Sequence, residues 1–179
     1  AIAEGQVDFA LTQPAHYALM TYRNGVSSPL ATLVDQVGGY PLAVFGGVIF
    51  TRADRTDLAR LADLRSKNLA TANLDSLGSY QMQALELARV GVRLPQNAHV
   101  IETHPPQDRV VQAGLAGQAG AGFVRTGVIE AMIQEGKLDP AALKILNPQT
   151  VAHFPHQLST RLYPEWAFVA MPATDSVLA

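Results

Sequence analysis

Residues 69–89 read LATANLDSLGSYQMQALELAR, and the fold class follows from this stretch. A short apolar run is followed by a loop of small and polar residues, and then by apolar residues that recur at helical spacing. A strand, a loop and an amphipathic helix in that order form the repeating unit of α/β proteins. We therefore predict a strand at 69–72 and a helix at 79–89, whose inner face would carry Met82, Leu85 and Ala88.

The same alternation continues on both sides of this stretch, through residues 45–147. Strands are predicted at 48–50, 99–102, 121–124 and 143–146, and helices at 56–64, 108–115 and 126–135. Thr56 is expected to cap the first of these helices. Strands and helices in this order predict a largely parallel sheet covered by helices.

Residues 1–44 and 148–179 flank this region, and each contains a strand pattern, at 7–11 and 167–171. We expect these two strands to pair with each other. The prediction is an α/β chain of two lobes, in which lobe 1 comprises residues 1–44 and 148–179 and lobe 2 comprises residues 45–147. Two crossovers of this kind place a ligand cleft between the lobes, at the carboxyl ends of strands.

The composition excludes several classes of protein. The 179 residues are 48% hydrophobic and 16% charged, which is typical of a folded globular chain. A net charge of −2 gives no basic surface for nucleic acid, and the absence of cysteine excludes disulfides and thiolate sites. No run of about 18 apolar residues could span a membrane. Because the chain opens in AIAEG, without a signal peptide, we interpret it as a piece of a longer protein.

Polar side chains gather at three predicted strand-to-helix loops. In the first, Thr12 can cap the following helix, with its hydroxyl and the free N–H groups facing the cleft, and Tyr17 lies in that helix. The alternative is that Thr12 only caps and Tyr17 only packs. In another, Arg125 and Thr126 could clamp an oxyanion, or Arg125 could instead pair on the surface with a glutamate such as Glu130.

The remaining loop opens the helix at 79–89 and contains Ser76, Gly78, Ser79 and Tyr80. Hydroxyls and unpaired N–H groups at a helix N-terminus form an anion site. The alternative is that one of the two serines is simply the N-cap. A neighbouring carboxylate, Asp75, would oppose an anion unless it points away.

Residues 156–166, HQLSTRLYPEW, concentrate two hydroxyls, a guanidinium, a phenol, a carboxylate and the only tryptophan. Flanking prolines disfavour a long helix. The segment could grip a small polar ligand through Arg161, or it could be a structural corner that packs Trp166 and pairs Arg161 with Glu165. Both interpretations stay open at this point.

Other apparent motifs give no site. The glycines of 114–122 resemble a dinucleotide fingerprint, but they follow a helix and lead into a strand, which is the reverse order. Two histidines near Glu165 could suggest a metal site, but Pro155 breaks the helix that their spacing would need. Ser159 lacks a glycine-flanked elbow and a His–Asp pair. We therefore expect no catalytic residue, no metal and no cofactor.

Several segments together resemble a known family. Residues 7–17, VDFALTQPAHY, resemble the "DxxLTxPxHY" segment of phosphonate-type periplasmic solute-binding domains. Residues 63–67 with 75–80 resemble the "DLKGK … SxGxY/W" region of that family. The strongest likeness to a subgroup is to the sensor domains of tetrathionate-sensor-like histidine kinases, and it is carried by residues 122–126, Glu130, residues 135–137 and above all STRLYPEW at 159–166.

This resemblance covers nearly the whole chain and implies a type II-like Venus-flytrap domain that binds a small anionic solute between its lobes. It implies a periplasmic location, an inner-membrane parent anchored by segments outside this chain, and a homodimer formed through the kinase. The ligand contacts that it implies are Thr12, Tyr17, Ser76, Gly78, Ser79 and Tyr80. Reasoning from the residues adds Arg125, Thr126 and Arg161.

The chain departs from the family pattern at two places. Gly120 stands where members usually have an acidic residue, which serves the ligand's amine in aminophosphonate transport proteins. This departure argues against an aminophosphonate ligand. The strand and helix that precede the strand at 7–11 are missing, so we expect the first lobe to be truncated at its N-terminus.

We predict the non-enzymatic sensor domain of a two-component histidine kinase, in which ligand contacts favour the closed state of the lobes. The alternative is the substrate-binding protein of a phosphate- or phosphonate-type ABC importer, which has the same fold and cleft. An enzyme of this shape would need a catalytic base near Ser76–Tyr80, and the sequence offers none. Anions such as tetrathionate, sulfate, phosphate or phosphonates are expected to raise the melting temperature.

Overall fold

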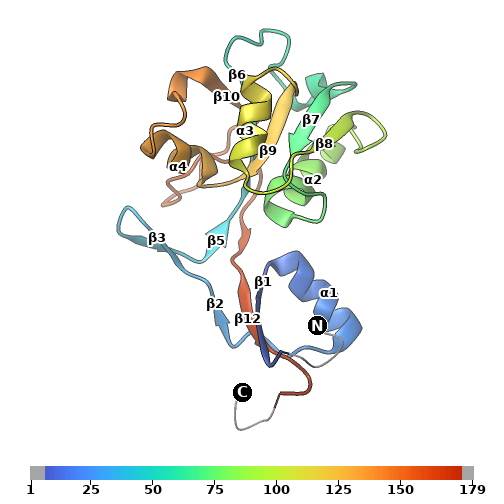
Figure 1. Ribbon diagram of the computed structural model, residues 1–179, viewed down its shortest axis with the longest axis vertical. Coiled ribbons are helices and arrows are strands. Elements are labelled where there is room, and N and C mark those ends of the chain that lie inside the picture. The colour runs from blue at the N-terminus through green and yellow to red at the C-terminus, as the bar shows by residue number, and fades with distance from the viewer. Residues whose placement is uncertain (1–6, 175–179) are drawn as a thin grey trace. The chain divides into compact units, whose positions relative to one another are not determined.

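The computed structural model describes residues 7–174, which fold into two units (Figure 1). Unit 1 contains the chain up to Val44 and again from Tyr163, and unit 2 contains Phe45–Leu162. Each unit has hydrophobic clusters of its own. Two short strands that pair with each other, β5 (Val44–Phe45) and β11 (Tyr163–Pro164), lie where the chain passes from one unit to the other.

Unit 2 is built on a five-stranded sheet in the order β10–β6–β9–β7–β8. Its strands are β6 (Gly47–Arg52), β7 (Asn68–Thr71), β8 (His99–Glu102), β9 (Ala121–Arg125) and β10 (Leu143–Leu146). Strand β7 pairs in parallel with both β8 and β9, so these three strands end at the same side of the sheet. We call this side the carboxyl edge of unit 2; it is marked by Thr71, Glu102 and Arg125.

The sheet is mixed rather than largely parallel, because β6 runs antiparallel to both of its neighbours, β9 and β10. Gly47 at the start of β6 is paired with Arg125 at the end of β9. The chain therefore enters the sheet at the carboxyl edge, and its first strand has to run away from that edge. The sequence pattern marks a strand here but carries no information on its direction.

Helices cover both faces of the sheet, so that successive residues of β6 enter different cores. Val48 and Phe50 lie in the core beneath α3 (Asp108–Leu115) and α4 (Val128–Gln134), whereas Ile49 lies in the core beneath α2 (Met82–Arg89). All three side chains are 0% exposed. Complete burial of such a side chain stabilises the fold by about 1.5–3 kcal/mol.

Two predicted helices of unit 2 are shorter than the sequence suggests. Only one 3-10 turn, η2 (Leu61–Leu64), forms in the segment 56–64, and Thr56 does not cap it. The carboxylate of Asp63 accepts the N–H groups of Ala59 at 3.0 Å and Arg60 at 2.8 Å instead. Helix α4 begins after Gly127, whose φ of 90° is left-handed and forms the turn between β9 and the helix. A further 3-10 turn, η4 (Pro140–Ala142), leads into β10.

The predicted helix at 79–89 is a π-turn, η3 (Leu77–Gln81), followed by α2. Its inner face differs from the expected one, since Leu85 is 38% exposed and Ala88 is also exposed. The residues that point inward are Met82, Gln83, Glu86 and Leu87. Gln83 and Glu86 can take these positions because the Gln83 amide donates two hydrogen bonds there and Glu86 accepts from Arg89.

Unit 1 contains a three-stranded sheet in the order β1–β12–β2. Its strands are β1 (Phe9–Thr12), β2 (Ala31–Thr32) and β12 (Ala167–Ala170), and a hairpin of β3 (Asp35–Val37) and β4 (Tyr40–Leu42) follows β2. The antiparallel pairing of β1 with β12 confirms the predicted pairing of the chain's first and last strands. Helix α1 (Pro14–Asn24) connects β1 to the core around Val169.

Thr12 does not cap α1, contrary to the sequence prediction. The N-cap is Gln13, which makes no capping bond with its side chain, and Pro14 occupies the first turn. Because proline has no N–H to satisfy, the helix starts with one fewer free donor. Thr12 is instead the last residue of β1, paired with Ala167.

The second passage between the units lies at Leu162/Tyr163 rather than at the predicted 147/148, so residues 148–162 belong to unit 2. Ser159 explains the difference. Its hydroxyl accepts the N–H of Ile49 at 2.9 Å and donates to the carbonyl of Leu146 at 2.8 Å. Asn147 also donates to the carbonyl of Ser159 at 2.8 Å. These buried bonds hold the returning segment on the sheet of unit 2.

Candidate functional site

The π-turn η3 lies at the carboxyl edge of unit 2, directly after β7. Ser76 is its N-cap and accepts the N–H of Ser79 at 3.2 Å, which is the structural role that the sequence left open. The hydroxyl of Thr71, the last residue of β7, donates to the carbonyl of Ser79. Gly78 and Ser79 are both buried. The end of the strand and the start of the helix are therefore locked together.

Gly78 brings this turn against the end of β9. A Cβ at this position would lie 3.1 Å from the ring of Phe45 and 3.2 Å from the Cβ of Arg125. Both distances are tighter than most real Cβ contacts, so a glycine allows the backbone of the turn to approach Arg125 closely. The structure thus brings together two of the loops that the sequence singled out.

Arg125 is half-buried and contacts Phe45 through its side chain and Gln107 through its backbone. Its guanidinium lies over the ring of Phe45, with the central carbon 4.6 Å from the ring centroid. Its backbone N–H donates to the side-chain oxygen of Gln107 at 2.7 Å. Glu130, the surface partner considered from the sequence, accepts the N–H of Gln157 and faces His156 at 3.8 Å.

Thr126 is buried, and its hydroxyl is used inside unit 2. It accepts the N–H of Gly46 at 3.1 Å, while its own N–H donates to the carbonyl of Gly46 at 3.0 Å. Thr126 therefore fixes the entry of β6 beside the end of β9. Its position next to Arg125 makes it a neighbour of the candidate site.

Sequence reasoning missed four residues that shape this edge: Phe45, Thr71, Thr103 and Gln107. Thr103 follows β8, and its N–H donates to the carbonyl of Thr71 at 2.8 Å. A rule that collects polar residues at the end of every predicted parallel strand would have found Thr71 and Thr103. Phe45 carries no such signal, because it reaches the edge from the entering chain.

The edge places the start of a helix beside a half-buried guanidinium, and both features are typical of sites for small oxyanions. Two carboxylates flank it. Glu102 accepts the N–H of Leu74 at 2.7 Å, so its charge is partly balanced by that donor. Asp75 is exposed, and its backbone N–H donates to the side-chain oxygen of Asn73 at 2.7 Å.

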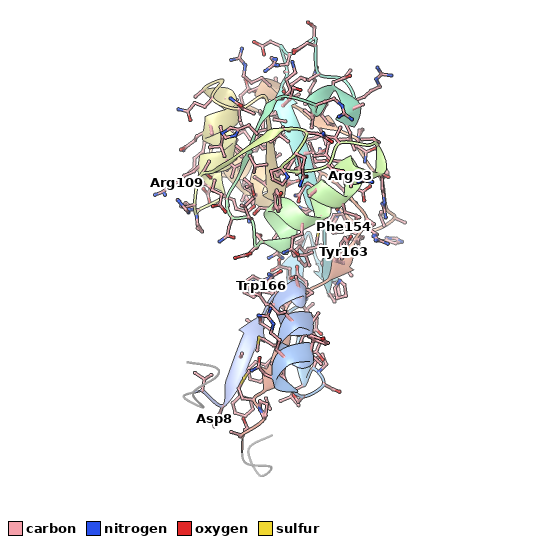
Figure 2. All side chains as sticks on the ribbon, turned by 90° about the vertical axis from the view of Figure 1, so that its right-hand side faces the viewer. Asp8, Arg93, Arg109, Phe154, Tyr163 and Trp166 are labelled. Atoms are coloured by element: carbon pink, nitrogen blue, oxygen red, sulfur yellow. The ribbon has the colours of Figure 1, made fainter. Side chains whose placement is uncertain are left out.

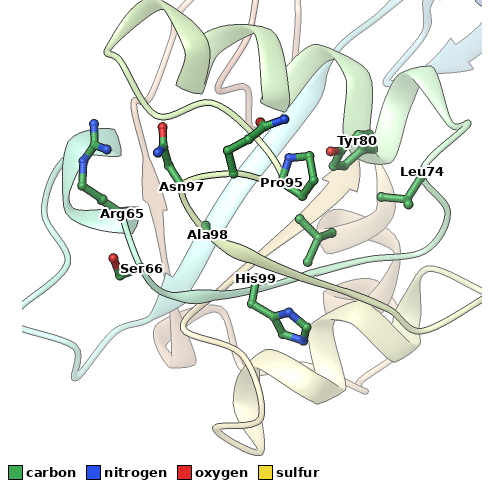
Figure 3. A pocket seen from close by; sticks show the side chains of 10 residues that line it. Arg65, Ser66, Leu74, Tyr80, Pro95, Asn97, Ala98 and His99 are labelled. Carbon is green, nitrogen blue, oxygen red and sulfur yellow. The ribbon is translucent and has the colours of Figure 1, made fainter.

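Tyr80 lines a different cavity of unit 2, with a volume of about 610 Å³ (Figure 3). Most of its walls come from residues 65–66 and 95–100, near the amino ends of β7 and β8. Burial raises the pKa of the Tyr80 phenol. Tyr80 therefore lines a cavity to which Arg125 does not contribute.

Arg161 is exposed and lines another cavity of unit 2, of about 380 Å³, together with Glu86 and Arg89. Arg89 donates to both carboxylate oxygens of Glu86, at 2.8 and 2.9 Å. The neighbouring Ser159 and Thr160 are buried and serve the structure of unit 2. Glu165 is also buried and accepts the N–H of Trp166 at 3.2 Å.

The two candidate residues of unit 1 are Tyr17 and Thr12. The Tyr17 hydroxyl donates to the carbonyl of Ser27 at 3.3 Å, and its ring packs on the core that contains Val26. This is the packing role considered from the sequence. Thr12 is half-buried at the end of β1.

Gly120 does not lie at the carboxyl edge. It precedes the amino end of β9, where a Cβ would lie 3.6 Å from the side chains of Arg55 and Lys67. An extended strand of five residues is roughly 16 Å long, so a side chain here would be far from Arg125. Gly120 therefore lies away from the candidate site at the carboxyl edge, and the exclusion of an aminophosphonate ligand stays a prediction.

Within residues 7–174, no three or more His, Asp or Glu side chains gather as a metal site would require. Over the same residues, no helix combines the length and apolar character that a membrane span needs.

Comparison with known proteins gives relatives over the whole chain. The tetrathionate sensor histidine kinase TtrS of Salmonella typhimurium strain LT2 is 29% identical over 180 residues, which cover 100% of this chain and 30% of the kinase. This chain therefore spans less than a third of that relative. The sequence model of the family described as "ABC transporter, phosphonate, periplasmic substrate-binding protein" matches residues 1–179.

Solved structures of two-lobed periplasmic binding proteins share the fold. XAC2383 from Xanthomonas citri, bound to chloride, superimposes with a TM-score of 0.71 at 21% identity, over 97% of this chain and 60% of its own. PhnD1 from Prochlorococcus marinus, in complex with methylphosphonate, gives 0.65 at 12% identity, over 96% and 59%. With the family match over all of its residues, this chain belongs to the phosphonate-type periplasmic substrate-binding proteins.

Proposed function

We propose that this chain is the ligand-sensing domain of a two-component sensor histidine kinase and that it binds a small oxyanion between its two units. The observation that carries the proposal is the close contact between the backbone of Gly78 and the side chain of Arg125 at the carboxyl edge of unit 2. The positive end of the helix that starts after Ser76 and the guanidinium held over Phe45 can attract the same anion there. Ser76, Ser79 and Thr126 support this arrangement, and Thr12 and Tyr17 are the proposed contacts from unit 1.

Binding would act as a signal by increasing the fraction of molecules in the closed state. An anion held by unit 2 gains further contacts when unit 1 closes on it, so the closed state becomes more populated. The closed state is then read by a kinase domain outside this chain. The parent is proposed to be an inner-membrane protein that exposes this domain to the periplasm, and relatedness to TtrS over the full chain supports this assignment.

The ligand class follows from the donors. N–H groups and a guanidinium recognise tetrahedral or elongated oxyanions, so tetrathionate, sulfate, phosphate and phosphonates are the candidates. Because the relative TtrS is a tetrathionate sensor, tetrathionate is the first anion to test. None of the candidate residues is assigned a catalytic role.

The alternative is a substrate-binding protein of a phosphate- or phosphonate-type ABC importer. The family match over residues 1–179 favours it, since that family is described as a transporter component. The two functions differ in the architecture of the full gene. A kinase domain encoded in the same chain supports the sensor, and a chain that ends as a free binding protein supports the importer.

Titration of the full-length protein with single anions tests the proposal. Melting temperature and heat of binding are measured with tetrathionate, sulfate, phosphate and methylphosphonate, at an ionic strength held constant with chloride. A stabilising anion at 100 times its Kd raises the stability of the domain by roughly 2.7 kcal/mol. A protein whose melting temperature and heat signal respond to none of these anions does not have the proposed function.

A further inference from the structure

Gln83 is a fully buried amide on the inner face of α2, with 0% of its surface exposed. Its side-chain nitrogen donates to the backbone carbonyls of Gly78 at 2.8 Å and Val124 at 3.0 Å. Gly78 belongs to the π-turn of the proposed anion site, and Val124 directly precedes Arg125 in β9. Both amide hydrogens are therefore spent on backbone next to the site.

Gly47, the first residue of β6, lies against the same amide. A Cβ at Gly47 would lie 2.4 Å from Nε2 and 2.7 Å from Cδ of Gln83, distances that side chains do not tolerate. The backbone of Gly47 is also bound to the returning segment: its N–H donates to the Thr160 hydroxyl at 2.9 Å, and its carbonyl accepts the N–H of Ser159 at 2.9 Å. Gln83 thus contacts the turn, the end of β9 and the start of β6.

The side chain of Gln83 carries a stability penalty. Its Oε1 atom is buried, and within residues 7–174 it has no hydrogen-bond partner. A buried acceptor without a donor is destabilising, whereas an apolar side chain of similar size would avoid this loss. Packing alone therefore does not explain a glutamine here, while its contacts with three parts of the site do.

We propose that Gln83 is a positioning residue that links the anion-binding turn to the segments by which the chain enters and leaves unit 2. This inference rests on the proposed anion site at Gly78 and Arg125. An anion bound at the turn would reduce the mobility of its backbone, including the carbonyl of Gly78. Because Gln83 contacts Gly78, Val124 and Gly47, the mobility of Val124 and Gly47 would fall as well. Gly47 is hydrogen-bonded to Ser159 and Thr160, so the same effect would reach these two residues.

Amide hydrogen exchange of the full-length protein tests the link, because exchange reports local opening segment by segment. The variant is Gln83→Met, which keeps the length of the side chain but has no donors. The matched control is Gln112→Met, the same change at an exposed position of α3. Exchange is measured with and without tetrathionate, and in parallel with inorganic phosphate.

We expect Gln83→Met to speed exchange at residues 77–82 and 46–49 by about tenfold without anion, while its melting temperature stays within roughly 4 °C of the parent's. A saturating anion is expected to slow both segments in the parent and in Gln112→Met. In Gln83→Met, a saturating anion is expected to slow amide exchange only at residues 77–82. If Gln83→Met does not fold, Gln83→Asn, which keeps the amide but shortens its reach, is expected to show the same separation.

Each outcome decides between the two proposals. Unchanged exchange at both segments of the variant without anion overturns the positioning role, whatever the anion does. Slowing of residues 46–49 by anion in Gln83→Met overturns the link to the entry segment. If no anion slows exchange in the parent, the anion site fails; faster exchange of the variant at both segments then still supports positioning by Gln83.

Discussion

The guanidinium of Arg125 lies over the ring of Phe45, 4.6 Å from its centroid, at the place where a third residue, Gly78, leaves room for both. A flexible arginine is thereby held in one orientation before any ligand arrives. Such pre-organisation reduces the entropy lost on binding. The phenylalanine comes from the entering chain and the arginine from the end of β9, so the site depends on both.

Replacing Arg125 by lysine is expected to weaken anion binding. Lysine keeps the charge but lacks the planar fork that binds two oxygens at once and stacks on a ring. The loss expected is about 1.5–3 kcal/mol, which is roughly ten- to a hundredfold in Kd by isothermal titration calorimetry. Arg93→Lys, at an exposed arginine of unit 2 (Figure 2), is the control. Equal affinity of Arg125→Lys and the parent would remove Arg125 from the site.

Ser159→Ala is expected to destabilise unit 2 without changing its surface. The serine is 0% exposed, and its hydroxyl bridges the N–H of Ile49 and the carbonyl of Leu146. Leaving these buried groups without their partner costs about 1–3 kcal/mol, measured as a lower midpoint of urea denaturation. Ser28→Ala, at an exposed serine, should leave the midpoint unchanged. A midpoint equal to the parent's would mean that Ser159 does not anchor the returning segment.

Gly122→Ala is expected to destabilise the core rather than any nucleotide site. A Cβ at Gly122 would lie 2.3 Å from the ring of Phe50. The resulting overpacking should lower the free energy of unfolding by about 1–3 kcal/mol. The double variant with Phe50→Leu should recover part of the loss, which a double-mutant cycle measures. Gly120→Ala is the matched control, because its Cβ would meet nothing closer than 3.5 Å. Additive losses in the cycle would contradict the proposed clash.

Asp63 gives unit 2 a pH dependence of known sign. The N–H groups of Ala59 and Arg60 hold the pKa of its carboxyl below the ordinary value of 3.8. A carboxyl with a lowered pKa in the folded state stabilises the protein at pH values above its unfolded pKa, and this stabilisation is lost as the pH falls through the folded pKa. The parent should therefore lose more stability than Asp63→Asn between about pH 5 and pH 2.

Denaturation midpoints across that range measure the difference, with Asp8→Asn as an exposed control in unit 1 (Figure 2). Parallel pH profiles for the parent and Asp63→Asn would show that this cap does not contribute to folding. A difference between the two profiles would also support Asp63, rather than Thr56, as the residue that caps this turn.

Local periodicity was sufficient to predict much of unit 2. Strand β8 and helix α3 have the predicted bounds, since each is a short pattern with clear ends. The direction of β6 was not predictable, because it depends on the edge at which the chain enters the sheet. The inner face of α2 was also misjudged: buried hydrogen bonds place Gln83 inside, and hydrophobicity alone would not.

The candidate site was also predictable only in part from the sequence. Parallel strands end at a common edge, which brings the Ser76–Ser79 turn near Arg125. Phe45 could not be predicted in the same way, since its place depends on the antiparallel entry of the chain. Tyr80 and Arg161 line other cavities, because the direction of a side chain is set by packing that sequence spacing does not encode.

The bonds between Gly47 and the Ser159–Thr160 segment have a consequence for the architecture of the gene. They hold the beginning and the end of unit 2 side by side, with Gly46 next to the carbonyl of Arg161. A domain whose ends are adjacent can be exchanged as an insert between related proteins, and can be circularly permuted. We therefore expect residues 45–162 to be exchangeable between related chains as one segment.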